Sequence, residues 1–196
     1  MPWPFVFPYA LLFWLIFLLA YLPEFGITAR SRPRARETGS QDGGSHGVIL
    51  YGSALAYVAA FALAWVKPLR VPDEWNPFVF AAGLALLLLG SLLRWHCRRV
   101  LGTYFTGDVR VQATQPVINQ GAYAWVRHPS YSGATLKNLG IGLALGSWAS
   151  FAFLAIVSLA VYRYRMKVEE RVLLETLGDP YRRYMATHKR LIPFLY

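Results

Sequence analysis

Long apolar runs separated by short polar stretches dominate the pattern of this chain. The first run, 3–22, is almost wholly apolar, and two more follow at 48–66 and 77–95. At 1.5 Å per residue, each run would reach about 30 Å as a helix, which is the thickness of the hydrocarbon core of a bilayer. The pattern therefore predicts three membrane-spanning helices in the first half of the chain.

The first run could instead be a cleaved signal peptide, which would need a basic start and a small-residue cleavage site. Here the chain starts Met-Pro-Trp-Pro, and Tyr-Leu-Pro follows the apolar run. These flanks favour a retained membrane helix.

A fourth apolar region, 133–162, is too long for one upright helix, since about 30 residues would stretch to about 45 Å. Gly146, Ser147 and Trp148 interrupt the region. The interruption favours a hairpin of two helices, 133–145 and 148–164. A single long tilted helix stays open as the alternative.

Polar segments join and follow the apolar runs. Alternating arginines at 30–36 and a Gly- and Ser-rich stretch at 39–45 predict a basic loop and a flexible linker. The segment 97–131 is too polar to span a membrane, so we expect an interfacial loop. Beyond it, apolar residues recur at helical spacing up to a Gly-Asp-Pro stop at 178–180, and a short basic helix is expected at 181–189.

Composition agrees with the membrane class, because 56% of the residues are hydrophobic and the mean hydropathy is +0.34. Lys and Arg number four in 23–46, five in 94–131 and eight in 163–196, against two in 67–75. By the positive-inside rule, the N-terminus is expected outside or in a lumen and the C-terminus in the cytosol. The net charge of +10 is thus explained by membrane topology. The sequence contains no recognisable nucleic-acid-binding motif, so we expect no nucleic-acid partner.

The length of 196 residues fits a single domain, 1–196, whose motif-bearing part is 97–196. Cys97 is the one cysteine, which excludes an internal disulfide and a multi-cysteine metal site. We expect no bound metal.

The most distinctive polar stretch is 120–133, which reads Gln-Gly-Ala-Tyr-Ala-Trp-Val-Arg-His-Pro-Ser-Tyr-Ser-Gly. Pro129 disfavours helix for the residue before it, so Arg127 and His128 are expected in an extended or turn conformation. A cation, an imidazole and two hydroxyls at a membrane boundary could hold a polar, charged cofactor. The planar fork of an arginine matches a carboxylate.

A second block, Arg165-x-x-x-Glu169-Glu170, follows in the tail. Arg165 lies one helical turn before Glu169, so both side chains can point at one cleft. The alternative is a solvated acidic helix face whose carboxylates form local ion pairs. Likewise, Tyr131, Tyr181 and Tyr184 have an alternative reading as aromatic residues of the membrane interface.

Together these blocks resemble the cofactor motif of the isoprenylcysteine carboxyl methyltransferase and phospholipid methyltransferase family. The resemblance starts near Gly102 and includes the tail sequence Gly-Asp-Pro-Tyr-x-x-Tyr with a late Ile-Pro. Members are small integral-membrane enzymes that use S-adenosylmethionine. The resemblance implies an all-α polytopic membrane helix bundle of about five membrane helices, the last two a hairpin, with a cytosolic cofactor pocket.

The resemblance also implies roles for individual residues. Arg165, as a contact of the methyl acceptor, and Glu170 become catalytic candidates. Pro116 departs from the family, which has a hydroxyl-bearing residue there. The residues implied in cofactor binding are Gln115, Pro116, Val117, Ile118, Tyr123, Arg127, His128, Pro129, Ser130 and Glu169.

The function implied is methyl transfer from S-adenosylmethionine to a lipophilic or lipid-like acceptor in the membrane, for example an isoprenylcysteine-type carboxylate. Such an in-line displacement needs positioning and desolvation, and a carboxylate nucleophile needs no general base. An NADPH-dependent membrane sterol or steroid reductase is the alternative, because those enzymes resemble the chain at Arg-His-Pro-x-Tyr-x-Gly. There an acidic residue usually follows the glycine, whereas Ala134 follows here. A non-catalytic membrane scaffold is the third possibility.

Overall fold

The computed structural model describes residues 1–38, 44–107, 109, 111 and 115–192, with 25–38 described only as helical backbone. The predicted linker thus lies largely outside the described residues. Within the described part the fold is all-α and contains no β-strand, as predicted. Its helices are α1 Tyr9–Thr38, α2 Ser45–Leu63, α3 Asn76–Leu101, α4 Pro129–Ala144, α5 Trp148–Leu177 and α6 Asp179–Thr187, with 3-10 turns at Trp3–Phe5, Lys67–Leu69, Gly102–Tyr104 and Gly121–Ala124.

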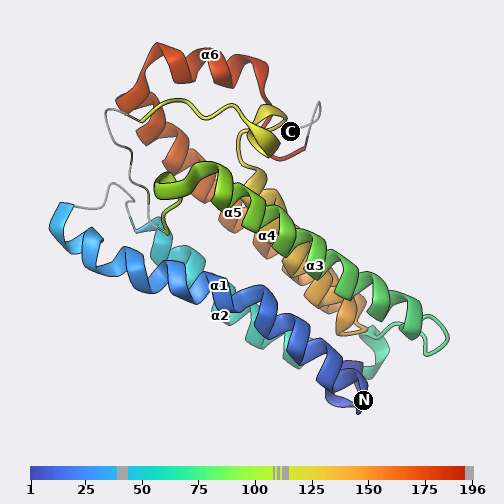
Figure 1. The fold of residues 1–196 in the computed structure, drawn as a ribbon. Coiled ribbons are helices and arrows are strands. Elements are labelled where there is room, and N and C mark those ends of the chain that lie inside the picture. Colours follow the sequence, from blue (N-terminus) through green and yellow to red (C-terminus); the bar gives the residue numbers. More distant parts are fainter. Residues whose placement is uncertain (39–43, 108, 110, 112–114, 193–196) are drawn as a thin grey trace.

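Helices α1 to α5 form the bundle, and α6 lies across one end of it (Figure 1). Among the described residues, three helices are long and apolar enough to cross a membrane, namely Ser45–Leu63, Asn76–Tyr104 and Trp148–Leu177. The stretch Tyr9–Glu24 of α1 is a shorter apolar helix, and α4 has 16 residues. The chain is therefore an integral membrane protein with a polytopic helical bundle.

The described loops lie at the two ends of the bundle. At one end, Arg70 donates a hydrogen bond to the carbonyl of Met1 at 2.9 Å, and the amide of Val71 donates to Gly146 at 2.9 Å. The segment that follows α3 and the whole of α6 lie at the opposite end (Figure 1). The two motif blocks therefore share one end of the bundle.

The hairpin prediction is confirmed, and the single tilted helix is excluded. Between α4 and α5 the chain reverses at Gly146, whose φ is +64°. The side chain of Ser147 then caps α5 by accepting a hydrogen bond from the amide of Ser150 at 3.2 Å. A side-chain cap satisfies a backbone donor that the first helical turn leaves unpaired.

Several predicted boundaries are wrong: α3 runs on to Leu101 and α4 begins at Pro129, both within the predicted loop 97–131, and the larger differences are in α1 and α5. The basic segment 30–36 is helical, because α1 continues to Thr38. Similarly, the second helix of the hairpin does not end at 164 but runs on as α5 to Leu177, where Gly178 ends it with a φ of +60°. Arg, Lys and Glu are good helix formers, so a change from apolar to charged residues does not by itself end a helix.

Glycines allow α3 and α4 to pack at backbone contact. A Cβ built on Gly140 of α4 would lie 2.6 Å from both the carbonyl oxygen of Gly83 and the amide nitrogen of Leu87 on α3. Small residues favour such close approach in membrane helices, where lipid offers no hydrophobic drive for association. This contact fixes α4, and with it the start of α4 at Pro129, against α3.

Gly140→Ala should therefore destabilise the bundle by roughly 1–3 kcal/mol, because backbone atoms must move to admit the methyl group. The matched control is Gly47→Ala on α2, where the nearest atom to a new Cβ is 3.9 Å away. Thermal unfolding of the two variants in the same detergent measures the difference. Equal melting temperatures for the two variants would show that the α3–α4 contact accommodates an added methyl group.

Candidate functional site

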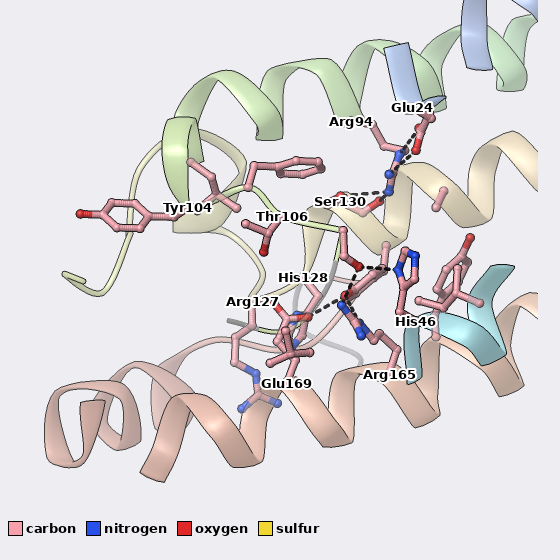
Figure 2. Close-up of a pocket in the computed structure, with 18 of the residues that line it drawn as sticks. Glu24, His46, Arg94, Tyr104, Thr106, Arg127, His128, Ser130, Arg165 and Glu169 are labelled. Carbon is pink, nitrogen blue, oxygen red and sulfur yellow. Dashed lines mark hydrogen bonds and ion pairs between the residues drawn. The ribbon is translucent and has the colours of Figure 1, made fainter. Parts of the chain in front are cut away.

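A cavity of about 800 Å³ opens at the end of the bundle where α6 lies. Its walls come from α1 to α6 and from the loop after α3. One side is apolar and is formed by α1 and α2 through Phe17, Ile49, Leu50 and Ala54. The other side is polar and carries the motif residues (Figure 2).

All but two of the predicted site residues line this cavity. The exceptions are Pro129, which is buried as the first residue of α4, and Glu170, whose carboxylate is turned to other side chains. The residues that line it are Gln115, Pro116, Val117, Ile118, Tyr123, Arg127, His128, Ser130, Arg165 and Glu169.

Directly before Pro129 the motif is non-helical, as the proline predicted. His128 has φ −127° and ψ 55°, and α4 begins at the proline. Just upstream, Gly121 has a φ of +58°, and a Cβ there would meet the imidazole of His96. The amide of Ala122 donates to His96 Nε2 at 3.3 Å, so a glycine is needed for the chain to pass this close.

A buried ion cluster around Glu170 fixes Arg127 and His128 of the motif. Oε1 of Glu170 accepts from His128 Nε2 at 3.1 Å and lies 3.3 Å from Arg127 Nη2. Arg190 donates to the same carboxylate, with Nη2 2.6 Å from Oε2. Glu170 is 4% exposed, which excludes a solvated acidic face at this position.

The second block meets the motif inside the cavity. Tyr131 donates to Glu169 Oε2 at 2.6 Å, and its hydroxyl oxygen accepts from Arg165 Nε at 3.3 Å. Arg165 also donates to Ser45 Oγ at 2.5 Å and to the carbonyl of Gly107 at 3.0 Å. Arg165 and Glu169 therefore do face one cleft, and Tyr131 joins them.

Two polar atoms of cavity-lining residues have no partner among the described residues. Among the described residues, the buried side-chain atoms without a hydrogen bond are Arg70 Nε, Gln115 Oε1 and Arg127 Nε. Gln115 and Arg127 both line the cavity. Buried polar atoms are rarely left unpaired, so an unpaired acceptor and an unpaired donor in one cavity indicate a bound molecule that carries both functions.

A second ion cluster escaped the sequence analysis. Glu24 of α1 accepts from Arg94 of α3 at 2.5 and 2.6 Å, and from Lys137 of α4 at 2.9 Å. Arg94 also donates to Oγ of Ser130, as the dashed lines in Figure 2 indicate. The available signal was Lys137, a lone cation in an apolar run, because charges within membrane helices are rare and usually paired.

Tyrosines 123 and 184 pack under the loop and stay neutral. Burial raises the pKa of Tyr184 to about 12. Burial, together with Cys97, raises the pKa of Tyr123 far above its ordinary range. The hydroxyl of Tyr184 donates to the carbonyl of Tyr123 at 2.5 Å. Tyr181 and Tyr184 are buried against the cavity, so the interface-aromatic reading is wrong for them.

Tyr184→Phe should cost about 1 kcal/mol of stability at pH 8, because a buried hydrogen bond is lost. The native phenol stays protonated up to about pH 12, whereas an unfolded one ionises near pH 10. Its stabilisation is therefore complete below about pH 10 and falls as the pH rises toward 12. Thermal unfolding at pH 8 and 11 should show the difference from the parent chain shrinking. A difference that grows at pH 11 would contradict this, and Tyr51→Phe, at an exposed site, is the control.

These features define a class: a polytopic helical membrane protein with a cavity at one end that is charged on one side and apolar on the other. The model of the isoprenylcysteine carboxyl methyltransferase (ICMT) family matches residues 83–175. Over these residues the chain is similar to this family, in agreement with the resemblance of the two sequence blocks.

Individual relatives support the relationship. A protein-S-isoprenylcysteine O-methyltransferase from Schizosaccharomyces pombe is 29% identical over 136 residues, which cover 66% of this chain and 58% of that protein. The protein of the same name from Rattus norvegicus is 25% identical over 184 residues, covering 90% and 62%. This chain thus spans less than two thirds of the length of these relatives.

A solved structure supports the fold. The structure described as the eukaryotic intramembrane Ras methyltransferase ICMT superimposes with a TM-score of 0.63 at 24% identity. The superposition covers 73% of this chain and 52% of that one. The membrane bundle predicted from the apolar runs is therefore an architecture that a solved structure shares.

Proposed function

We propose that the chain is a membrane methyltransferase that moves a methyl group from S-adenosylmethionine to a lipophilic acceptor. It acts as a single domain, 1–196, with the chemistry in 97–196. The observation that carries the proposal is the cavity itself: both blocks face it, and an apolar wall completes it.

The residues present fit S-adenosylmethionine. The unpaired Nε of Arg127 is a donor for the cofactor's carboxylate, and the unpaired Oε1 of Gln115 is an acceptor for an amino group. Glu169 adds a carboxylate at the cavity surface, and Tyr123 adds an aromatic wall. When bound, the cofactor supplies an activated methyl group on its sulfonium sulfur.

The acceptor side is assigned to Arg165 and the apolar wall. An arginine held by Ser45 and Gly107 is a fixed cation that can orient an anionic group. The apolar side chains of α1 and α2 suit a lipid-like tail. Since the relatives are named isoprenylcysteine O-methyltransferases, an isoprenylcysteine-type carboxylate is the first acceptor to test.

No residue is assigned as a general base, because a carboxylate acceptor is already nucleophilic. Glu170, a catalytic candidate from the sequence, is assigned instead to holding Arg127 and His128. By the positive-inside rule the cavity faces the cytosol and the N-terminus the outside or a lumen. The matches reported above are all to carboxyl methyltransferases, so the reductase and scaffold readings are not favoured.

Binding of S-adenosylhomocysteine to the detergent-purified protein tests the proposed cofactor, with NADPH as the competing ligand. Heat release on titration with S-adenosylhomocysteine, and none with NADPH, is expected. The converse result would replace the methyltransferase with a reductase. Binding of neither would leave the non-catalytic scaffold.

Arg127→Ala and His128→Ala should each weaken S-adenosylhomocysteine binding by about tenfold or more, because each removes a polar contact from a largely buried site. Arg127→Lys should behave similarly, since lysine keeps the charge but lacks the Nε donor. The exposed Arg183→Ala is the matched control. Unchanged affinity in a folded Arg127→Ala protein would remove this residue from the cofactor site.

Arg165→Ala should leave S-adenosylhomocysteine affinity within about twofold of the parent and lower turnover by about a hundredfold or more, because the misplaced acceptor no longer meets the methyl group. Turnover is measured with labelled S-adenosylmethionine and an isoprenylcysteine analogue. Normal turnover in the variant would take Arg165 out of the acceptor site.

A further inference from the structure

The segment 189–191, which we call the C-terminal clamp, runs alongside the cofactor motif. The amide of Arg127 donates to the carbonyl of Lys189 at 2.8 Å, and the amide of His128 donates to the carbonyl of Arg190 at 2.9 Å. Ser132 Oγ donates to the carbonyl of Leu191 at 2.8 Å. The clamp lies outside the residues that the family model matches, which end at 175.

The side chain of Arg190 fixes the orientation of Glu170. Its Nε lies 3.1 Å from both carboxylate oxygens, and its Nη2 lies 2.6 Å from Oε2. Glu170 is nearly fully buried, and its side chain is 5% exposed against 23% for Arg190. An arginine that donates to both oxygens sets the plane of a carboxylate, which a single point charge does not.

In this orientation Glu170 determines which nitrogen atoms of His128 and Arg127 are paired within the protein. Its Oε1 accepts a hydrogen bond from Nε2 of His128 at 3.1 Å and lies 3.3 Å from Nη2 of Arg127. Nε of Arg127 is left as a buried donor without a partner in the part of the chain that the structure describes. This is the atom assigned above to the cofactor's carboxylate.

Without Arg190, Glu170 would compete with the cofactor. Carboxylates and guanidinium groups favour a two-bond pairing, and a carboxylate released from Arg190 can turn to form it with the fork of Arg127. That pairing would consume the donor that the cofactor needs. Holding side chains in productive orientation through their neighbours is a general requirement of precise sites.

We propose that Arg190 is a positioning residue of the cofactor site, which confines the contact between Glu170 and Arg127 to Nη2 and so keeps Nε of Arg127 for the cofactor. The proposal rests on the proposed function, and it extends the site to a segment that neither sequence block contains. Arg190 acts through Glu170 and does not itself line the cavity.

Arg190→Ala should weaken S-adenosylhomocysteine binding by about tenfold, while turnover at saturating S-adenosylmethionine stays within about twofold of the parent. A loss of affinity without a loss of turnover distinguishes a misoriented cofactor site from a general loss of structure, which would lower turnover as well. Arg182→Ala removes an exposed arginine of α6 that pairs with Asp179, and it should bind like the parent. Arg190→Lys keeps a charge but loses the fork, so its loss should be smaller than that of Arg190→Ala.

A double variant tests the route through Glu170. In the Arg190→Ala, Glu170→Gln protein the neutral amide cannot capture Arg127 as an ion, so the affinity should match that of Glu170→Gln alone within about twofold. Losses that multiply would mean that Arg190 acts independently of Glu170, and this would overturn the proposal.

The remaining outcomes are also decisive. If the parent chain binds S-adenosylhomocysteine and Arg190→Ala binds it equally well, the positioning role is wrong and the proposed function stands. If the parent chain does not bind it, the proposed function falls and the role of Arg190 falls with it. Should Arg190→Ala fail to fold, Arg190→Lys decides, and an affinity equal to that of the parent would overturn the proposal.

Discussion

The buried carboxylate of Glu170 is the constraint on which the structure of the cavity end depends. Removing a charge from water is costly unless partners replace the lost hydration, and Glu170 finds them in His128, Arg127 and Arg190. Those partners come from the loop before α4 and from the chain after α6. One ionised group therefore ties the end of α5, the motif and the C-terminal clamp into a single unit.

The ion cluster around Glu24 likewise joins separate elements, here three helices of the membrane bundle. Contacts between apolar helices gain little in lipid, because lipid tails are as apolar as the side chains they replace. Glu24, Arg94 and Lys137 instead join α1, α3 and α4 through charged hydrogen bonds. Arg94 extends the cluster to Ser130, so the membrane helices and the site are fixed by one connected set of polar contacts.

Much of this fold could be read from the sequence, because length and apolarity dictate where helices cross a bilayer. The hairpin, its interruption at Gly146 and the stop at Gly178 followed from residue types with strong backbone preferences. The helical state of 30–36 did not, because charge indicates a polar environment but says little about backbone conformation. Arg190 could not be found either, since only three-dimensional packing distinguishes it from its basic neighbours.

Helix α5 has a consequence for how the site meets the lipid. It runs without a break from Trp148 to Leu177, so Arg165 and Glu169 stand on the same rigid rod that crosses the membrane. Bilayers of different thickness are accommodated by tilting such rods. The spacing between the two side chains is then preserved in thin and thick membranes alike, while their depth relative to the headgroups varies.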